Sequence, residues 1–369
     1  MDTDLIVNKA DLGDVALVES PTANTEPGPG QVRLRVDQFG LTSNNLSYAG
    51  AGEMLGYWNF FPTADSAWGI VPVWGFATVE ASNHDEIDVG EELYGYLPMG
   101  RSLIIEPHDV SAAHCSDRFA HRAALHPWYN RYYRVANDPS SPEGSRHLQP
   151  LLWALHMTGW MLANQFTDND DFGCDQVIVA SASSKTAVAF ARSMQTRRTQ
   201  RGSATEQDGP RRIGLTSPAN AAFVESLGCY DEVRTYDAIG AEAMQGTATL
   251  VDMSGNAGVV SEIHHGFGDR LVDSIRIGST HLSARGDTEG LPGPTRRFFF
   301  IPDVAEARAA DIGQEAYHRE FAAAWEAYGQ WVGDFVTVQA ATGPEAIRDA
   351  YLAALGGTHN PAKGLIFNY

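Results

Sequence analysis

A cluster of hydroxyl side chains and one lysine follows an apolar segment in the middle of the chain. Residues 176–180 read Gln-Val-Ile-Val-Ala, residues 181–186 read Ser-Ala-Ser-Ser-Lys-Thr, and a helical pattern continues to about residue 195. The pattern predicts a strand, a tight turn and a helix. Hydroxyls, backbone N–H groups and a positive charge at the start of a helix favour a phosphate. We therefore expect an anion to bind at Ser181, Ser183, Ser184, Lys185 and Thr186. The alternative is that Ser183 or Ser184 only caps the helix.

Phenol side chains form a second group with possible chemistry. Tyr48 lies in the first third of the chain, and the segment HPWYNRYYRV at 126–135 contributes Tyr129, Arg131, Tyr132 and Tyr133. A phenol can protonate a developing enolate or alkoxide, and several together can line a pocket for an aromatic substrate. The alternative is that these rings only pack together, at a domain interface in the case of the second segment.

Metal binding and several other chemistries lack the residues they need. The chain has three widely spaced cysteines, Cys115, Cys174 and Cys229, and its histidines show no established ligand spacing, so we expect no metal. The motifs G-x-S-x-G and H-E-x-x-H and a Walker lysine loop do not occur, which leaves hydrolase and kinase functions without support.

Composition sets the class of protein and limits its partners. The 369 residues are 43% hydrophobic and carry a formal net charge of −20, so we expect a folded chain that repels nucleic acid and anionic membrane surfaces. The acidic N-terminus does not resemble a signal peptide, and the longest apolar stretch, 151–166, is too short and polar to span a bilayer. With so few cysteines, we expect a cytoplasmic protein.

The elements that must position these residues change in character along the chain. Up to about residue 100 the sequence shows short β-rich runs separated by glycine and proline, and a turn-rich segment at 137–145 marks a domain junction. Strand and helix patterns then alternate, which predicts an α/β domain with a doubly wound parallel sheet. After residue 294 the sequence predicts a long helix over 312–332, a strand, a helix at 344–355 and a final strand.

Several segments, in order along the chain, resemble the medium-chain dehydrogenase/reductase superfamily, specifically its zinc-free, quinone-oxidoreductase-like branch. The segment RIGLTSPANAAFVESLGCYDEV at 212–233 carries this resemblance most specifically, and QVIVASASSKTAVAFARSM at 176–194 stands where that family has its glycine-rich cofactor turn. The other segments are 27–50, 89–100, 151–164, 249–260, 274–281 and 343–369. The resemblance implies a GroES-like catalytic domain at 1–147, a Rossmann domain at 148–294, and a return to the catalytic domain at 295–369.

The resemblance also implies site residues. The family's nicotinamide and its ribose lie along positions that match Thr158, Ser254, Gly255, Ser279 and Thr280, and the alternative is ordinary strand-end turn chemistry. Asn45 matches a polar residue of the family's substrate cleft, so Asn45, Tyr48 and Tyr132 are the expected catalytic residues.

Two departures from the family bear on its cofactors. The zinc ligands of the zinc-dependent branch are replaced by Thr42 and Phe76, and the cofactor turn has no glycine. After the second strand, where an acidic residue would hold the ribose of NAD(H), the chain has Thr216, Ser217 and Asn220, which favours NADP(H). The residues that could add charge for a 2′-phosphate are Lys185, Arg192, Arg211 and Arg212, and the alternative is that they are solvated surface residues.

We therefore expect a zinc-independent, NADP(H)-dependent oxidoreductase that transfers hydride to an activated alkene, quinone or carbonyl. The expected partners are a small-molecule substrate, aromatic or an enone, and a second copy of the chain in a homodimer. The alternative is a lyase, an isomerase or a nucleotide-responsive binding protein that keeps the fold and has lost hydride transfer.

Overall fold

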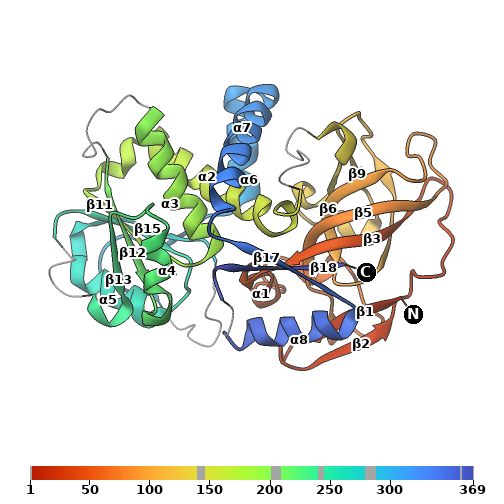
Figure 1. Ribbon diagram of the computed structural model, residues 1–369, viewed down its shortest axis with the longest axis horizontal. Helices are drawn as coiled ribbons and strands as arrows, with labels where there is room; N and C mark the ends of the chain where they lie inside the picture. Colours follow the sequence, from red (N-terminus) through yellow and green to blue (C-terminus); the bar gives the residue numbers. More distant parts are fainter. Residues whose placement is uncertain are drawn as a thin grey trace. The chain divides into compact units, whose positions relative to one another are not determined.

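The computed structural model describes residues 2–138, 146–200, 209–239, 245–278, 288–357 and 360–368 (Figure 1). The chain divides into two compact units. Unit 1 consists of Met1–Ala154 and Val336–Tyr369, and unit 2 consists of Leu155–Phe335. Unit 1 is built mainly of β-strands and unit 2 of alternating strands and helices, so the predicted α/β class is confirmed.

Unit 1 contains two sheets within its described residues. A small antiparallel sheet has the order β2-β1-β4, and a nine-stranded sheet has the order β17-β18-β3-β5-β6-β10-β9-β8 with β7 paired to β3. The small sheet consists of β1 (Thr3–Asn8), β2 (Val15–Glu19) and β4 (Trp68–Gly69). The large sheet consists of β3 (Val32–Leu41), β5 (Pro72–Ser82), β6 (Glu92–Pro98), β7 (Ser102–Ile105), β8 (Pro107–His108), β9 (His114–Asp117), β10 (Arg131–Arg134), β17 (Thr337–Thr342) and β18 (Lys363–Asn368).

The central strand β3 shows why this sheet forms. Val32, Leu34 and Val36 are buried and alternate with partly exposed arginines, as expected for a strand with one face on the core. At its end, Gly40 lies under the start of α2 (Gln149–Asp168), where an added Cβ would stand 2.4 Å from the Pro150 carbonyl oxygen. Only glycine lets that helix begin so close to the strand. Two further helices belong to this unit, α1 (Ser43–Gly50) and α8 (Pro344–Leu355).

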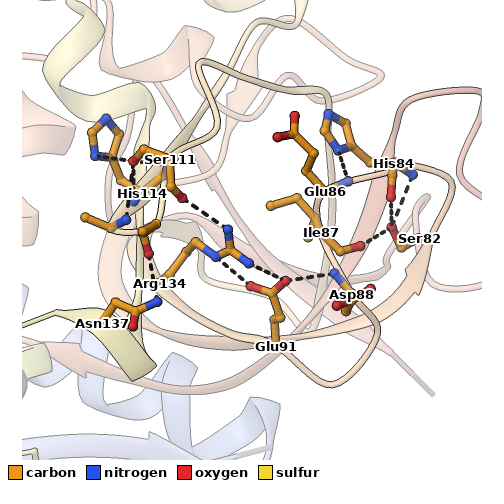
Figure 2. Close-up of polar contacts among 12 residues, drawn as sticks. Ser82, His84, Glu86, Ile87, Asp88, Glu91, Ser111, His114, Arg134 and Asn137 are labelled. Carbon is orange, nitrogen blue, oxygen red and sulfur yellow. Dashed lines mark hydrogen bonds and ion pairs between the residues drawn. The ribbon is translucent and has the colours of Figure 1, made fainter.

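Polar side chains hold the turn between β5 and β6 in place (Figure 2). The Ser82 hydroxyl donates to the Ile87 carbonyl oxygen over 2.6 Å, which closes the turn on itself. Glu91 then receives two hydrogen bonds from the Arg134 guanidinium of β10, at 2.8 and 2.7 Å, and Arg134 also donates to the Ser111 carbonyl oxygen. A partly buried, two-pronged pair of this kind fixes geometry better than an exposed ion pair. It ties the β5–β6 turn to β10 and to the loop before β9.

Unit 2 is built around a sheet with the order β13-β12-β11-β14-β15-β16, all parallel. The first strand of the unit lies in the centre, two strands follow on one side and three on the other, so the order reverses between β11 and β14. Ligands of such sheets bind at the carboxyl ends of the strands where the order reverses. The strands are β11 (Gln176–Ala180), β12 (Arg211–Thr216), β13 (Glu232–Thr235), β14 (Ala248–Asp252), β15 (Leu271–Arg276) and β16 (Arg297–Phe298). The connecting helices are α3 (Lys185–Gln200), α4 (Ala221–Ser226) and α5 (Ala257–Phe267).

Helices α6 (Ile301–Ile312) and α7 (Gln314–Val332) also belong to unit 2. The aromatic face of α7 packs on α2, with the His156 ring stacked 4.4 Å from the Tyr328 ring and Trp160 against Phe321. Residues 295–335, which the sequence analysis placed with the returning catalytic domain, are therefore packed into the second unit. None of the helices in the described residues is long and apolar enough to cross a membrane.

Candidate cofactor and substrate sites

The turn after β11 adopts the conformation that a glycine usually supplies. Ser181 has a φ of +65°, and its backbone N–H donates to the Tyr236 hydroxyl over 3.0 Å. The next residue, Ala182, donates from its N–H to the Leu215 carbonyl oxygen of β12. A left-handed φ costs a non-glycine residue about 1 kcal/mol or more, and these hydrogen bonds offset that cost. The backbone therefore makes the tight turn of the dinucleotide fold although its glycine is missing.

Ser184 begins helix α3 as its N-cap. Its N–H donates to the Ser181 carbonyl oxygen over 2.9 Å, and its hydroxyl accepts from the Ala187 N–H over 3.4 Å. The Ser184 hydroxyl therefore caps the helix, which is the alternative to phosphate binding that the sequence left open for this residue. Among the described residues the N–H of Thr186 makes no hydrogen bond, so the first turn of this 16-residue helix presents a backbone donor. Such a donor at a helix N-terminus is suited to an anion.

Lys185 is the first residue of α3 and is 9% exposed. Burial lowers the pKa of its amine to about 8. A cation at this position is disfavoured twice, because it is desolvated and because the N-terminus of a helix already carries partial positive charge. A bound anion would relieve both effects.

The end of β12 carries polar groups and no carboxylate. Thr216 is buried, Ser217 follows it, and the Asn220 side-chain amide donates to the Ser183 hydroxyl over 3.2 Å. This hydrogen bond joins the residues after β12 to the turn after β11. Arg234 of β13 lies in register opposite Leu215, next to this strand end, with its guanidinium paired to Glu232. Sequence reasoning missed Arg234 because only the pairing of β12 with β13 brings it to this edge.

The arginines that the sequence analysis named as candidates for binding a 2′-phosphate do not lie at the Thr216 end of β12. Arg211 and Arg212 begin β12, about 13–16 Å of strand away from Thr216, and they pair with Glu232 and Asp231, respectively. The Arg192 guanidinium lies over the Trp331 ring, 4.9 Å from its centroid. These contacts give no support to the expectation that the three residues supply charge to a phosphate.

The end of β14 is organised by a buried carboxylate. One oxygen of Asp252 accepts from the Ser254 N–H, the Ser254 hydroxyl and the Gly255 N–H, at 2.9, 2.7 and 3.0 Å, and the other pairs with Arg296. Gly255 has a φ of +65°, which this turn requires. Thr158 is a partly exposed residue of α2, and Ser279 and Thr280 lie outside the described residues.

Two of the three expected catalytic residues use their polar atoms within unit 1. The Asn45 side-chain oxygen accepts from the Thr42 N–H at the start of α1, and its amide donates to the Pro72 carbonyl oxygen. Tyr132 is fully buried, and its hydroxyl donates to the Tyr96 carbonyl oxygen over 2.8 Å. Both side chains thus hold backbone segments together.

Tyr48, the third expected residue, belongs to a cluster of phenols in unit 1. Its ring lies 4.8 Å from that of Tyr57 and 5.5 Å from that of Tyr96, and the Tyr96 ring lies 4.9 Å from that of Tyr129. The Trp74 indole N–H donates to the Tyr48 hydroxyl over 3.2 Å, and the hydroxyls of Tyr57 and Tyr129 are 3.0 Å apart. Burial raises the pKa of all four phenols, so they are neutral at physiological pH.

The sequence placed Tyr129 in an aromatic wall but missed Tyr57 and Tyr96. The alternation of aromatic residues in ELYGYLP of β6 is the signal for Tyr96. It does not show which partners that ring meets, because these come from other strands and turns.

Within the part of the chain that is described, no three His, Cys, Asp or Glu side chains come together as metal ligands. The three cysteines are buried, and burial raises the pKa of Cys115 and Cys229 to about 12. These thiols therefore remain protonated and unreactive.

Comparison with known proteins gives one family match and a set of similar folds. Residues 39–360 match the family model described as "Protein of unknown function (DUF2855)", and no curated protein matches the sequence. CurA from Vibrio vulnificus in complex with NADPH is 18% identical with a TM-score of 0.57, and the match covers 99% of this chain and 98% of CurA. The YhdH oxidoreductase from Salmonella enterica in complex with NADP is 12% identical, with a TM-score of 0.54. The CurK enoyl reductase is 13% identical, with a TM-score of 0.53. The last two matches cover 100% of this chain and 99% of each structure. These likenesses confirm the predicted two-domain α/β fold.

Proposed function

We propose that this chain, which belongs to the family described as "Protein of unknown function (DUF2855)", is an NADP(H)-dependent oxidoreductase. It would transfer hydride to an activated alkene, quinone or carbonyl without zinc. The observation that carries the proposal is the left-handed Ser181 turn, which leads into the N-terminus of α3 where the strand order reverses between β11 and β14. Two structures of similar fold, CurA and YhdH, hold NADPH and NADP respectively, which supports the choice of cofactor.

Each part of the nucleotide has candidate partners at the carboxyl edge of the unit 2 sheet. The Thr186 N–H and the Lys185 amine would meet the pyrophosphate. Ser217, Asn220 and Arg234 would meet the 2′-phosphate, and the lack of a carboxylate after β12 removes the usual partner of an NAD(H) ribose. When bound, NADPH supplies the hydride.

Tyr48 is the proton donor that we assign to unit 1. Asn45 and Tyr132 are left out of this role because their polar atoms are used in backbone hydrogen bonds. The Tyr48 hydroxyl accepts a hydrogen bond from an indole N–H, which can only donate, so the phenol keeps its own proton for another acceptor.

Arg234 provides a direct test with a matched control in the same chain. Arg234 and Arg211 both pair with Glu232, but Arg211 begins β12, whereas the Arg234 backbone lies in register with Leu215, next to the end of that strand. We expect Arg234→Gln to weaken NADPH binding about 10- to 100-fold, the value of a hydrogen bond to a charged group, and to leave NADH binding unchanged. Arg211→Gln should change neither. Titration by nucleotide fluorescence measures both, and equal losses in the two variants would contradict the assignment of Arg234.

Lys185 is the reason to consider a second function, nucleotide binding without redox chemistry. Its side chain stands where the family has a small glycine, so the site would also suit a protein that binds a nucleotide and does no redox chemistry, such as a lyase, an isomerase or a nucleotide-responsive binding protein. Incubating the protein with NADPH and a panel of enones and quinones separates the two. Tight binding with no oxidation of NADPH across the panel favours the second function.

The expected setting of the reaction is a small-molecule substrate, a homodimer and the cytoplasm. The three buried cysteines are consistent with a reducing compartment. Light scattering during size-exclusion chromatography tests the dimer, because it gives the mass in solution directly, and a mass near 40.0 kDa would show a monomer instead.

A further inference from the structure

Two tyrosine hydroxyls contact the backbone of the turn after β11, which has no glycine. Tyr236, the residue after β13, accepts a hydrogen bond from the Ser181 N–H over 3.0 Å. Tyr230, in the loop before β13, donates its hydroxyl proton to the Ala182 carbonyl oxygen over 3.0 Å. A backbone N–H only donates and a carbonyl oxygen only accepts, so the direction of both hydrogen bonds is fixed. Two consecutive residues of the turn are therefore bound by side chains from beside β13.

Ser181 is the residue of this turn that needs support. Its φ of +65° is one that a residue with a side chain rarely adopts, because the Cβ then crowds the backbone. Its partner Tyr236 follows β13, which lies on the far side of β12 from β11. A Ser181 residue with an ordinary φ would turn its N–H away from this hydroxyl. The hydrogen bond therefore stabilises the left-handed conformation in particular.

A glycine in the adjacent strand makes room for this arrangement. An added Cβ at Gly214 of β12 would stand 3.0 Å from the Ala182 Cβ and 3.0 Å from a ring carbon of Tyr230. These distances are shorter than ordinary van der Waals contact, so a side chain at this position would press on the turn and on the ring. Its absence lets Tyr230 reach the Ala182 carbonyl oxygen.

The backbone groups that remain for a ligand follow from these contacts. The N–H groups of Ser181 and Ala182 are used by Tyr236 and by the Leu215 carbonyl oxygen. The next N–H, that of Ser183, makes no hydrogen bond with any residue in the described ranges. It precedes the N-terminus of α3, where an anion is favoured. Because the course of the chain after Ser181 depends on its dihedral angles, a change in these angles would move this donor.

We infer that Tyr236 and Tyr230 are positioning residues of the nucleotide site and replace the glycine that such a turn usually has. Tyr236 keeps Ser181 in the left-handed conformation, and Tyr230 fixes the peptide group that follows Ala182. Both act on the backbone and need no contact with the ligand. The fixed backbone does not depend on the proposed function, whereas its effect on NADPH affinity rests on that function.

A glycine at position 181 should rescue the loss of Tyr236. We expect Tyr236→Phe and Tyr230→Phe each to weaken NADPH binding about 3- to 10-fold in calorimetric titration, because one hydrogen bond to the turn is lost. In the double variant Ser181→Gly/Tyr236→Phe most of the affinity should return, since glycine adopts a positive φ without support. Tyr94→Phe is the matched control, because the Tyr94 hydroxyl also donates to a backbone carbonyl oxygen, that of Gln149 in unit 1. It should leave NADPH affinity unchanged.

Hydrogen exchange of the Ser181 amide gives a readout that needs no nucleotide. The amide should be protected in the parent protein and in Tyr94→Phe, and should exchange about 10-fold faster in Tyr236→Phe. Unchanged exchange in Tyr236→Phe would overturn the assignment, and so would a double variant that binds NADPH as weakly as Tyr236→Phe alone. A Tyr236→Phe variant that melts at a lower temperature and binds NADPH like the parent would show a merely structural role. If the parent binds no NADPH and Tyr236→Phe still loses protection at Ser181, the tyrosine positions the turn and only the proposed function fails.

Discussion

Replacing Lys185 with methionine should separate the energetic cost of its charge from its use in binding. Methionine keeps the unbranched stem and removes the amine. The pKa of the folded amine is about 8, against 10.5 in a model peptide, which corresponds to a burial cost of about 3 kcal/mol. We expect Lys185→Met to stabilise the protein without nucleotide by up to about that amount at pH 7 and to weaken NADPH binding by about 1–3 kcal/mol.

The effect of Lys185 on the stability of the folded protein should also depend on pH. Between pH 8 and 10.5 the unfolded chain holds a proton on Lys185 that the folded chain has lost, so the stability contributed at this residue rises with pH in that window. The stability of the Lys185→Met variant lacks this rise with pH. Below pH 8 the difference in the free energy of unfolding between the variant and the parent is constant. NADPH affinity of the parent should fall as the pH passes 8, because the amine loses the charge that meets a phosphate.

Thermal denaturation and calorimetric titration at pH 7 and pH 9.5 measure both effects. A variant that melts at a lower temperature and binds NADPH like the parent would refute the reasoning, since it would show that the Lys185 amine stabilises the fold through a protein partner.

Two further predictions concern unit 2. His156 is buried with a pKa of about 3, against 6.5 in a model peptide, so the stability of the folded protein should fall as the pH drops from 6.5 towards 3. His156→Phe should remove this dependence of stability on pH, which urea denaturation at pH 7 and pH 5 measures. Identical slopes would contradict this assignment. Gly159→Ala should destabilise the protein by about 1–3 kcal/mol, because its Cβ would stand 2.5 Å from the Phe190 backbone nitrogen of α3. Gly258→Ala, in an exposed part of α5, is the control and should be neutral or stabilising; equal losses in both glycine variants would show that helix contact is not the cause.

The fold could be predicted largely because the hydrophobic periodicity of the sequence indicates the strands and helices of unit 2. Short strands buried on both faces, such as Gln176–Ala180 and Ala248–Asp252, alternate with amphipathic helices, and this pattern has few solutions other than a parallel sheet. Residues 295–335 were harder to place. A helix pattern shows which face is apolar but does not identify the surface that covers it, which for α7 is the aromatic face of α2.

The candidate sites, like the fold, could be predicted only in part from the sequence. The position of the turn at Ser181–Lys185 follows from its strand and helix, whereas its left-handed backbone is invisible in a run of residues without glycine. Arg211 and Arg234 look alike in the sequence, and only the strand direction separates the amino edge from the carboxyl edge of the sheet. The rings around Tyr96 come from other segments of the chain, namely those of Tyr48, Phe60, Trp74 and Tyr129, and no local pattern encodes these contacts.

The proposed function depends most directly on which dinucleotide the protein binds. Calorimetric titration of the same preparation with NADPH and with NADH measures it. We predict tighter binding of NADPH, because no carboxylate follows β12 and Ser217, Asn220 and Arg234 can meet a 2′-phosphate. Equal affinity, tighter binding of NADH or no binding of either nucleotide would contradict the proposed function.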